Sequence, residues 1–238
     1  MKNKYLIILI SIVLFSCGNE RILQLPEIEN AKITEIRDVS PAYLFYDETK
    51  EDSIELNRKN LIITANWLVN VDKRLTLAQA IPKIKFLQEK KRNAELHKNE
   101  DAKNYFTCND TSIKNLGFLE FTDVFYHEDR STSPSSPLML ISNMMADNEM
   151  TEHPEIRSNN EVHIIRYDGE NKLKNKVLKY SEFSDYLNST LKNSNKDSLV
   201  VFLNFEKNLS FQDYINFKST IKDINIEGVR IGRTEFIY

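Results

Sequence analysis

The last third of the chain alternates strand-like and helix-like hydrophobic patterns, each bounded by turn or capping residues. Val162–Tyr167 predicts a strand that ends at Asp168-Gly169, a pair typical of tight hairpin turns. Lys172–Val177 predicts the returning strand, and Ser181 is placed to cap a following helix. Four apolar residues share one face of that helix at helical spacing: Phe183, Tyr186, Leu187 and Leu191.

A buried strand and a second amphipathic helix follow. Leu199–Leu203 contains no polar residue, as expected of a strand covered on both faces. Ser210 and Asp213 form a capping signature, Gly228 ends the helical segment, and Val229–Tyr238 predicts the last strand. The order is therefore β-β-α-β-α-β. The apolar face of the second helix comprises Phe211, Tyr214, Phe217, Ile221 and Ile224.

The first half carries a similar but weaker pattern. Ile33–Tyr46 is strand-like, most clearly at Ala42–Tyr46, where Pro41 and Asp47 bound an apolar run. Leu61–Ala65 predicts another short strand, and Ile113–Tyr126 returns to strand. We therefore expect a first α/β unit over residues 33–128 and a second over residues 161–238.

A charged helix is expected in the middle of the first unit. Thr76 followed by Gln79 resembles a capping box. Pro82 lies too deep for a first-turn proline, so the helix either kinks there or begins near it. The charged stretch Lys90–Lys103 predicts a solvated extension of this helix.

Residues 129–160 predict a linker rich in Ser, Pro and Met. Ser131–Pro137 is polar and turn-forming. Thioethers can hold a soft metal, but a loosely packed linker explains the Met residues without one. The fold class predicted is thus α/β (α+β), with two small β-β-α-β-α-β-like units joined by this linker. The Met residues of this linker are Met139, Met144, Met145 and Met150, with His153 nearby.

The start of the chain has the layout of an export signal. Lys2 and Lys4 are followed by the apolar run Tyr5–Phe15, which is too short to span a hydrocarbon layer of roughly 30 Å as a helix. The closing Leu-Phe-Ser-Cys sequence resembles the lipobox of bacterial lipoproteins, although Phe15 replaces the commoner small residue. The resemblance implies cleavage between Ser16 and Cys17, and a lipid on Cys17.

Lipidation sets the expected location. The protein would be held to a membrane through the lipid on Cys17, with residues 18–32 as a tether. Gly18, rather than Asp, follows the acylated position, which by analogy with enteric bacteria favours the outer membrane, facing the periplasm, with surface exposure as the other orientation. No transmembrane helix is expected in the mature chain.

Composition narrows the class of partner. The 238 residues carry a formal net charge of −3, so nothing favours nucleic acid as a ligand. Apolar residues at 41% and charged residues at 28% are typical of a folded protein. Only two cysteines occur, and a lipid on Cys17 leaves Cys108 without a disulfide partner, so we interpret Cys108 as a core residue.

Catalytic chemistry has no local motif. No histidine pair has zinc-ligand spacing, and no nucleophile elbow, phosphate loop or dinucleotide fingerprint is present. We therefore predict no catalytic, cofactor or metal residues. Trp67, the single tryptophan, belongs either to the core or to a sugar-stacking surface, and the core interpretation is favoured. The four histidines are His97, His127, His153 and His163.

The order of elements over residues 161–238 resembles the periplasmic domain of the ExbD/TolR biopolymer-transport family. Three short sequences match the positions where the family's strands and helices end: Asp168-Gly169, Glu206-Lys207 after the buried strand, and Gly228-Val229. Glu206 stands where the family commonly has Asp. The resemblance implies a small α/β module that dimerises and engages cell-wall polymer or partner segments. The family's proton-coupling helix has no counterpart here, so that role is not implied.

The first unit echoes the second. Asp72–Thr76 matches Glu206–Ser210 in the acidic-Lys pair and the following cap. Three further matches are weaker: Tyr46-Asp47 with Tyr167-Asp168, Leu61–Asn66 with Leu199–Asn204, and Thr122–Tyr126 with Thr234–Tyr238. We therefore expect an internal duplication whose units pair within one chain as a pseudo-dimer, with a homodimer as the other arrangement.

Two functional classes remain. The first is a non-enzymatic envelope scaffold that is accessory to an ExbD/TolR-type transport system. It would bind peptidoglycan or a partner protein through an exposed strand edge at Val229, Ile231 and Phe236. The second is a hydrolase or metal-dependent enzyme whose residues converge only in the folded chain. A shallow surface with an open strand favours the first class, whereas a deep pocket that gathers histidines and carboxylates favours the second.

Overall fold

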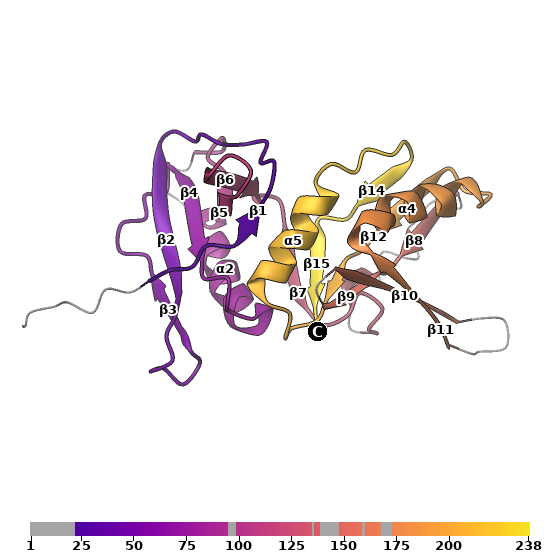
Figure 1. Cartoon of the computed structure of the whole chain (residues 1–238), viewed down its shortest axis with the longest axis horizontal. Helices are drawn as coiled ribbons and strands as arrows, with labels where there is room; N and C mark the ends of the chain where they lie inside the picture. The colour runs from indigo at the N-terminus through magenta and orange to yellow at the C-terminus, as the bar shows by residue number, and fades with distance from the viewer. Residues whose placement is uncertain (1–21, 95–98, 135, 139–147, 159, 168–172) are drawn as a thin grey trace, which may run out of the picture.

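Sheets and helices alternate along the computed structural model, which has an α/β fold (Figure 1). The structure describes residues 22–94, 99–134, 136–138, 148–158, 160–167 and 173–238. Within these ranges there are three α-helices and three sheets, of which two are mixed and one is parallel. The elements gather into two units that lie side by side (Figure 1).

The first unit is a mixed sheet with a helix on one face. Its elements are β1 (Glu27–Ile28), β2 (Val39–Tyr46), β3 (Ile54–Asn57), β4 (Asn66–Val71), α2 (Leu77–Arg92), β5 (Asn104–Asp110) and β6 (Asn115–Glu120). The strand order is β1-β5-β4-β2-β3, and β6 pairs with β5. Strands β1, β5, β4 and β2 are parallel, whereas β3 and β6 run antiparallel to their partners.

The second unit combines a mixed sheet and a three-stranded parallel sheet. Its elements are β7 (Phe125–Glu128), β8 (Glu149–Glu152), β9 (Glu155–Ser158), β10 (Glu161–Tyr167), β11 (Leu173–Lys179), the 3₁₀ turn η2 (Tyr180–Glu182), α4 (Phe183–Lys192), β12 (Ser198–Val201), β13 (Asn204–Phe205), α5 (Phe211–Ile221), β14 (Val229–Ile231) and β15 (Thr234–Ile237). The orders are β11-β10-β9-β13-β15-β7 and β14-β12-β8.

A single cluster of buried apolar residues runs through both units. Helix α2 contributes the side chains of Ile81, Ile84 and Leu87 to it, and α5 contributes those of Phe211 and Phe217. Burial of this cluster provides the main driving force for folding, since each large apolar side chain removed from water contributes about 1.5–3 kcal/mol. The units are therefore parts of one core.

The predicted β-β-α-β-α-β order of residues 161–238 holds only in part, because two predicted strands are each broken into two. Leu199–Leu203 gives way to β12 and β13, and Val229–Tyr238 to β14 and β15, and the two members of each pair lie in different sheets. Both cap signatures, in α2 and in α5, are confirmed. The Gln79 side chain accepts a hydrogen bond from the Thr76 N–H at 2.9 Å, and the Ser210 hydroxyl accepts one from the Asp213 N–H at 3.1 Å. Pro82 lies inside α2, which begins at Leu77. The alternative that the helix begins near Pro82 is wrong.

Two predicted elements of the first unit need correction. Leu61–Ala65 forms a turn, and the strand is Asn66–Val71, because it is there that Trp67, Val69 and Val71 alternate inward. The helix ends at Arg92 rather than continuing through Lys103, and residues 99–103 are not helical.

The expected linker and tether also change. Within residues 129–160, β8 and β9 join the sheets of the second unit, so residues 149–158 belong to its core. Residues 27–28, expected in the tether, form β1. Ser181 lies in the 3₁₀ turn, and α4 begins two residues later, because Tyr180 is buried against Phe217, with ring centroids 4.9 Å apart. Asp168-Gly169 lies outside the described residues.

The two units repeat one local arrangement. In the first unit the Asn70 side-chain amide donates to the carbonyls of Ala42 at 3.0 Å and Leu68 at 3.2 Å. In the second, Asn204 donates to the carbonyls of Pro154 at 3.2 Å and Phe202 at 3.0 Å. Each Asn immediately precedes the end of a central strand, so β2 and β4 correspond to β9 and β13.

This correspondence between strands supports one of the sequence matches between the two units and contradicts the other three. Asp72 donates its N–H to Leu44, and Glu206 donates its N–H to Ile156, each at 2.9 Å, so these acidic residues are equivalent. The matches at Tyr46-Asp47 and Leu61–Asn66 fall on different elements in the two units. Residues 122–126 are not the counterpart of 234–238, because the strand that lies beside β4 as β15 lies beside β13 is β5.

Candidate binding surfaces

The two units meet through the first turns of α2 and α5. Leu77 donates its N–H to the Leu209 carbonyl at 2.9 Å, and Phe211 donates its N–H to the Leu75 carbonyl at 2.7 Å. This reciprocity describes a local two-fold relation, like that in a symmetric dimer interface. It also satisfies N–H groups that have no partner inside a helix. A second reciprocal pair joins Ala78 to Lys207 and Gln212 to Lys73.

A buried polar chain fastens α5 to β7 and β15. The Tyr126 and Tyr214 hydroxyls lie 3.1 Å apart, and the Tyr214 hydroxyl donates to Glu235 Oε2 at 2.7 Å. Lys218 forms an ion pair with the same carboxylate. Burial raises the pKa of both tyrosines well above the usual value, so both keep their protons. The chain is fully bonded and has a structural role.

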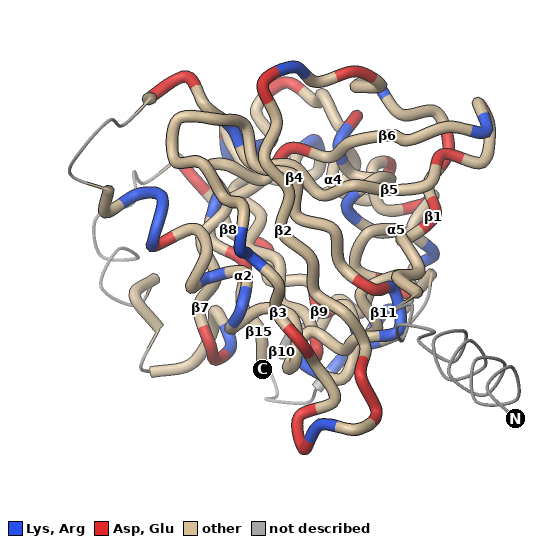
Figure 2. The backbone as a smooth tube through the Cα atoms, turned by 90° about the vertical axis from the view of Figure 1, so that its left-hand side faces the viewer, with Lys and Arg blue, Asp and Glu red and all other residues tan. Residues whose placement is uncertain are grey.

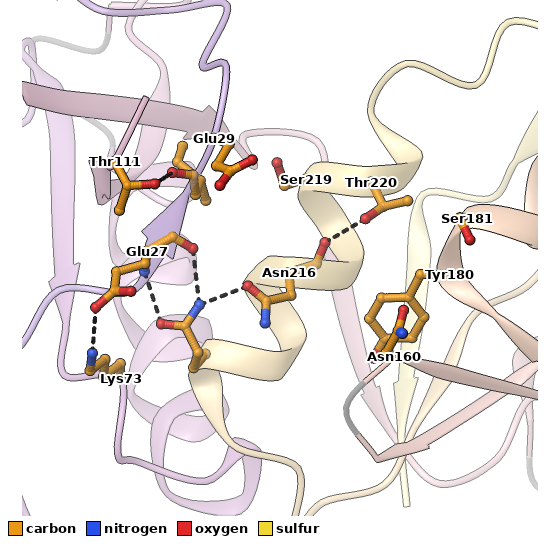
Figure 3. Close-up of a pocket in the computed structure, with 12 residues that line it drawn as sticks. Glu27, Glu29, Lys73, Thr111, Asn160, Tyr180, Ser181, Asn216, Ser219 and Thr220 are labelled. Atoms are coloured by element: carbon orange, nitrogen blue, oxygen red, sulfur yellow. Dashed lines mark hydrogen bonds and ion pairs between the residues drawn. The ribbon is translucent and has the colours of Figure 1, made fainter. Parts of the chain in front are cut away.

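An open polar groove of about 770 Å³ runs beside α5, between the units (Figure 3). Glu27 and Thr111 line it from the first unit, and Tyr180 and Ser181 line it from the second. The exposed side of α5 adds amides and hydroxyls, including Asn216. Its charged lining residues are Glu27, Glu29 and Lys73, of which Glu27 and Lys73 form an ion pair, and the remaining lining is mostly amides and hydroxyls that offer hydrogen bonds.

A second groove, of about 490 Å³, is mainly apolar. Phe118 and Leu119 of β6 form one wall, and Ile221, Ile224 and Ile231 form the other. Lysines lie at its rim, and the Lys222 ammonium donates to the Asn30 carbonyl at 3.1 Å. Glu120 also lines the groove, and Lys32 and Lys218 form ion pairs, so an apolar lining meets a rim of mixed charge.

Strand β14 borders the apolar groove and lies at the end of its sheet. Leu199 donates to the Gly228 carbonyl and Gly232 donates to the Val201 carbonyl, each at 2.8 Å. Because backbone groups of alternate residues point to opposite sides, Val229 and Ile231 direct theirs away from β12. The Val229 N–H bonds to Ile226 in a turn, which leaves the Ile231 backbone groups at the open side.

The predicted partner-strand edge is thus partly corrected. Val229 and Ile231 lie in an edge strand, whereas Phe236 does not. Phe236 pairs with Asn204 of β13 on one side and with His127 of β7 on the other, and it is buried. No local pattern predicts this closure, because β7 has only four residues and lies in the segment expected to belong to the first unit, residues 33–128.

One sheet face of the first unit carries few charges. Pro41, Tyr43 and Phe45 alternate along β2 with buried residues, and the two aromatic rings stack at 5.8 Å between centroids. Figure 2 shows the middle of strands β2, β4 and β5 free of charged residues, which gather in loops. This face offers apolar contact area rather than a site for chemistry.

The residues considered for chemistry are mostly structural. Trp67 is 1% exposed and its indole N–H donates to the Ile62 carbonyl at 2.7 Å, so it is a core residue. Cys108 is buried, and burial raises the pKa of its thiol, which disfavours the nucleophilic thiolate. His127 and His163 lie on separate strands. Ser16, Cys17, His97, Met139, Met144 and Met145 lie outside the described residues.

Lys91 is a buried cation that sequence reasoning placed on a solvated helix. Its ammonium donates to the carbonyls of Ala65 at 3.1 Å and Lys103 at 3.0 Å, and to Asn104 Oδ1 at 3.1 Å. Burial lowers its pKa to about 8. These bonds tie the starts of β4 and β5 to the end of α2, which accounts for the position where the helix stops.

One serine and one histidine are in hydrogen-bond contact. Ser131 Oγ lies 2.8 Å from His153 Nδ1, and His153 Nε2 lies 3.1 Å from Thr151 Oγ1. Burial lowers the pKa of His153, which favours the neutral ring. However, Ser131 is only 1% exposed, and the second imidazole nitrogen meets a hydroxyl rather than a carboxylate. The pair fixes the chain against the β8–β9 corner.

The described residues contain no group of three or more His, Cys, Asp or Glu side chains placed to hold a metal ion. Nor does any helix in the described ranges have the length and apolar content needed to cross a membrane. No protein-family model, curated protein or solved structure matches the chain. The surfaces described above therefore provide the basis for a functional proposal.

Proposed function

We propose that the protein is a lipid-anchored cell-envelope protein with a non-enzymatic binding or scaffold role. The Leu14–Cys17 sequence at the end of the apolar run supports the anchor, and Gly18 favours an outer-membrane protein that faces the periplasm. Two acyl chains would hold the protein firmly, because each buried methylene contributes about 0.8 kcal/mol. Its partner would be an envelope protein of an ExbD/TolR-type transport system, or peptidoglycan.

The two units are proposed to descend from an internal duplication and to form a pseudo-dimer within one chain. The matching Asn70 and Asn204 hydrogen bonds support this origin. So does the reciprocal pairing of Leu77 with Leu209 and of Phe211 with Leu75. A fused pair differs from two identical subunits, because each unit is free to acquire a different binding surface.

The binding mode proposed is addition of a partner strand to β14. One observation carries it: the open Ile231 backbone lies directly beside an apolar groove. Strand addition uses backbone hydrogen bonds for affinity and neighbouring pockets for alternate side chains. The ligand that fits is an extended segment with apolar side chains on one side and an acidic residue near Lys222.

Anchoring is tested by labelling cells with a fatty-acid analogue. The native chain should carry the label and begin at Cys17, and Cys17→Ser should abolish both labelling and membrane retention. Cys108→Ser is the matched control, and it should leave labelling unchanged because Cys108 is buried in the folded protein. A native protein that starts at Met1 without acyl mass would refute the anchor.

Strand capture is tested by a photo-crosslinking residue at the exposed Arg230 of β14, with Lys176 of β11 as a control edge. We expect a crosslinked envelope partner at Arg230 alone. Ile231→Pro should abolish this crosslink, since it removes the outward N–H without removing a bond to β12. Equal crosslinking at both edges, or no effect of Ile231→Pro, would contradict the mode.

The alternative, an envelope hydrolase, has the Ser131–His153 contact in its favour. A fluorophosphonate probe separates the two functions, because it labels serines that are activated and accessible. The scaffold proposal expects no labelling of Ser131 in the folded protein. Labelling that is lost in both Ser131→Ala and His153→Gln would favour the hydrolase.

A further inference from the structure

Residues 24–33, here called the strap, run through the space between the two units. The strap enters the first sheet as β1, parallel to β5. Asn109 donates its N–H to the Pro26 carbonyl at 2.8 Å, and Thr111 donates its N–H to the Ile28 carbonyl at 3.0 Å. Figure 1 shows β1 at the side of the first unit that faces α5.

The strap is also bound by the second unit. Gln212 of α5 accepts from the Glu27 N–H and donates to the Glu27 carbonyl, both at 2.9 Å, so a side-chain amide takes the place of a neighbouring strand (Figure 3). Further along, Lys222 donates to the Asn30 carbonyl. An ion pair between Lys32 and Asp223 adds a third link to the end of α5.

Two adjacent strap residues meet chemically distinct surroundings. Ile28 is 5% exposed and belongs to the common core, whereas Glu27 points outward and its carboxylate lies 2.7 Å from the Lys73 ammonium. The ion pair is partly exposed, so solvent and salt weaken it. The position occupied by the strap therefore selects an acidic residue followed by a large apolar residue in an extended backbone.

We propose that this position is a strand-binding slot, occupied by the strap in the resting protein and open to a competing extended segment when the strap leaves. The preferred competitor carries an acidic–apolar dipeptide that reproduces Glu27 and Ile28. This slot lies on the polar-groove side of α5 and is distinct from the β14 edge.

Release is favoured by the short ladder and by the place of the strap in the chain. Only two residues pair with β5, and the Glu27 side chain and both walls of the polar groove are open to solvent. Other contacts oppose release: Ile28 is buried, and the N–H groups of Asn30 and Ala31 donate to Ser112 Oγ and Asp110 Oδ2. A competing segment must therefore replace these contacts as the strap leaves. Opening of the slot does not require the lipid. The slot rests on the proposed function in one respect only, because tension on a lipid anchor at Cys17 would act on the strap before it acts on the rest of the fold.

The test uses the full chain from residue 18, unlipidated, and a fluorescent synthetic peptide of residues 22–34. In the native chain the strap competes at an effective concentration on the order of millimolar, so the peptide should bind weakly. Ile28→Asp within the chain weakens only the resident strap, and peptide affinity should rise about tenfold or more. A peptide with the same Ile28→Asp change should not bind, because its side chain cannot enter the core.

A second measurement covers the case in which Ile28→Asp fails to fold. In the native chain, hydrogen exchange at the Asn109 and Thr111 amides should be faster than at Trp67, whose N–H bonds to Lys103 within the first unit. Gln212→Ala should accelerate the first two and leave Trp67 unchanged. Exchange of all three only through global unfolding, or no peptide binding to folded Ile28→Asp protein, would overturn the slot, whereas a missing acyl group on Cys17 would overturn only the anchor.

Discussion

Asn70 and Asn204 show how a single polar residue can define the end of a buried strand. Each amide bridges two backbone carbonyls. For Asn70 these lie on β4 and on the parallel β2, and for Asn204 they lie just before β13 and just before the parallel β9. Asn204 does more, because its Oδ1 also accepts from the Ser131 N–H at 2.7 Å. Sequence patterns treat both residues as interruptions in an apolar run, whereas in the fold their polar groups are bonded.

Asn204→Ala should therefore destabilise the protein more than Asn70→Ala. Removing the Asn204 side chain takes one hydrogen bond from backbone groups of three residues, although the Pro154 carbonyl keeps the Asn204 N–H. A buried group left without a partner costs about 1–3 kcal/mol. We expect a loss of at least about 2 kcal/mol for Asn204→Ala, measured by urea unfolding. The exposed Asn208→Ala serves as control, and equal effects of Asn70→Ala and Asn204→Ala would contradict the added role of Ser131.

His153 should make stability depend on pH. Its folded pKa lies below the ordinary value of 6.5 because the ring is buried beside Phe202. The unfolded state therefore binds the proton more readily, and the contribution to stability is present above pH 6.5 and is lost as pH falls towards the folded pKa. His153→Gln should flatten this dependence in urea titrations between pH 7 and 5. An unchanged slope in the variant would assign the dependence to other groups.

Among the elements, length and amphipathic pattern decide what a sequence reveals. Helix α5 and strand β10 were predictable because their own residues carry a period and boundary residues. Strands β1, β7 and β13 contain only two to four residues and exist because a neighbour pairs with them. Their partners lie far away in the sequence, so no local pattern encodes them.

The same reasoning explains what was missed in the candidate surfaces. Val229 and Ile231 were placed at an edge because the chain ends soon afterwards, and that placement agrees with the end position of β14. Phe236 does not lie at an edge, because β7, which is far away in the sequence, pairs with β15 on its outer side. Both grooves lie between units, so their linings combine residues that no sequence window contains.

The contact between α2 and α5 can be weakened through one backbone atom. Ala78 is exposed in the first turn of α2, where its N–H has no intrahelical acceptor and instead donates to Lys207 at 2.8 Å. Proline is tolerated in a first turn, so Ala78→Pro removes this bond and little else. We expect a loss of about 1 kcal/mol in urea unfolding. Ala78→Ser keeps the N–H and should cost less; equal losses would show that the bond contributes nothing.

At the scale of the whole molecule, the units depend on each other through one continuous core. Phe106 of the first unit stacks on Phe121 at 3.8 Å and meets Phe211 of the second edge-on at 5.2 Å. The strap also joins the units, because it pairs with β5 of the first and is bound by Gln212 of the second. Such mutual dependence predicts a single cooperative unfolding transition rather than two.

The pseudo-dimer also predicts the oligomeric state. The N–H groups of the α2 and α5 first turns, which would drive pairing of separate units, are already bonded within one chain. Sedimentation velocity of the unlipidated chain from residue 18 should therefore give a monomer at micromolar concentration. Ala78→Pro should leave it monomeric, because Phe106 and Phe211 still hold the units together. An obligate dimer joined through the second unit alone would show that the contact between α2 and α5 is not the preferred pairing, and the duplication would then lose its physical rationale.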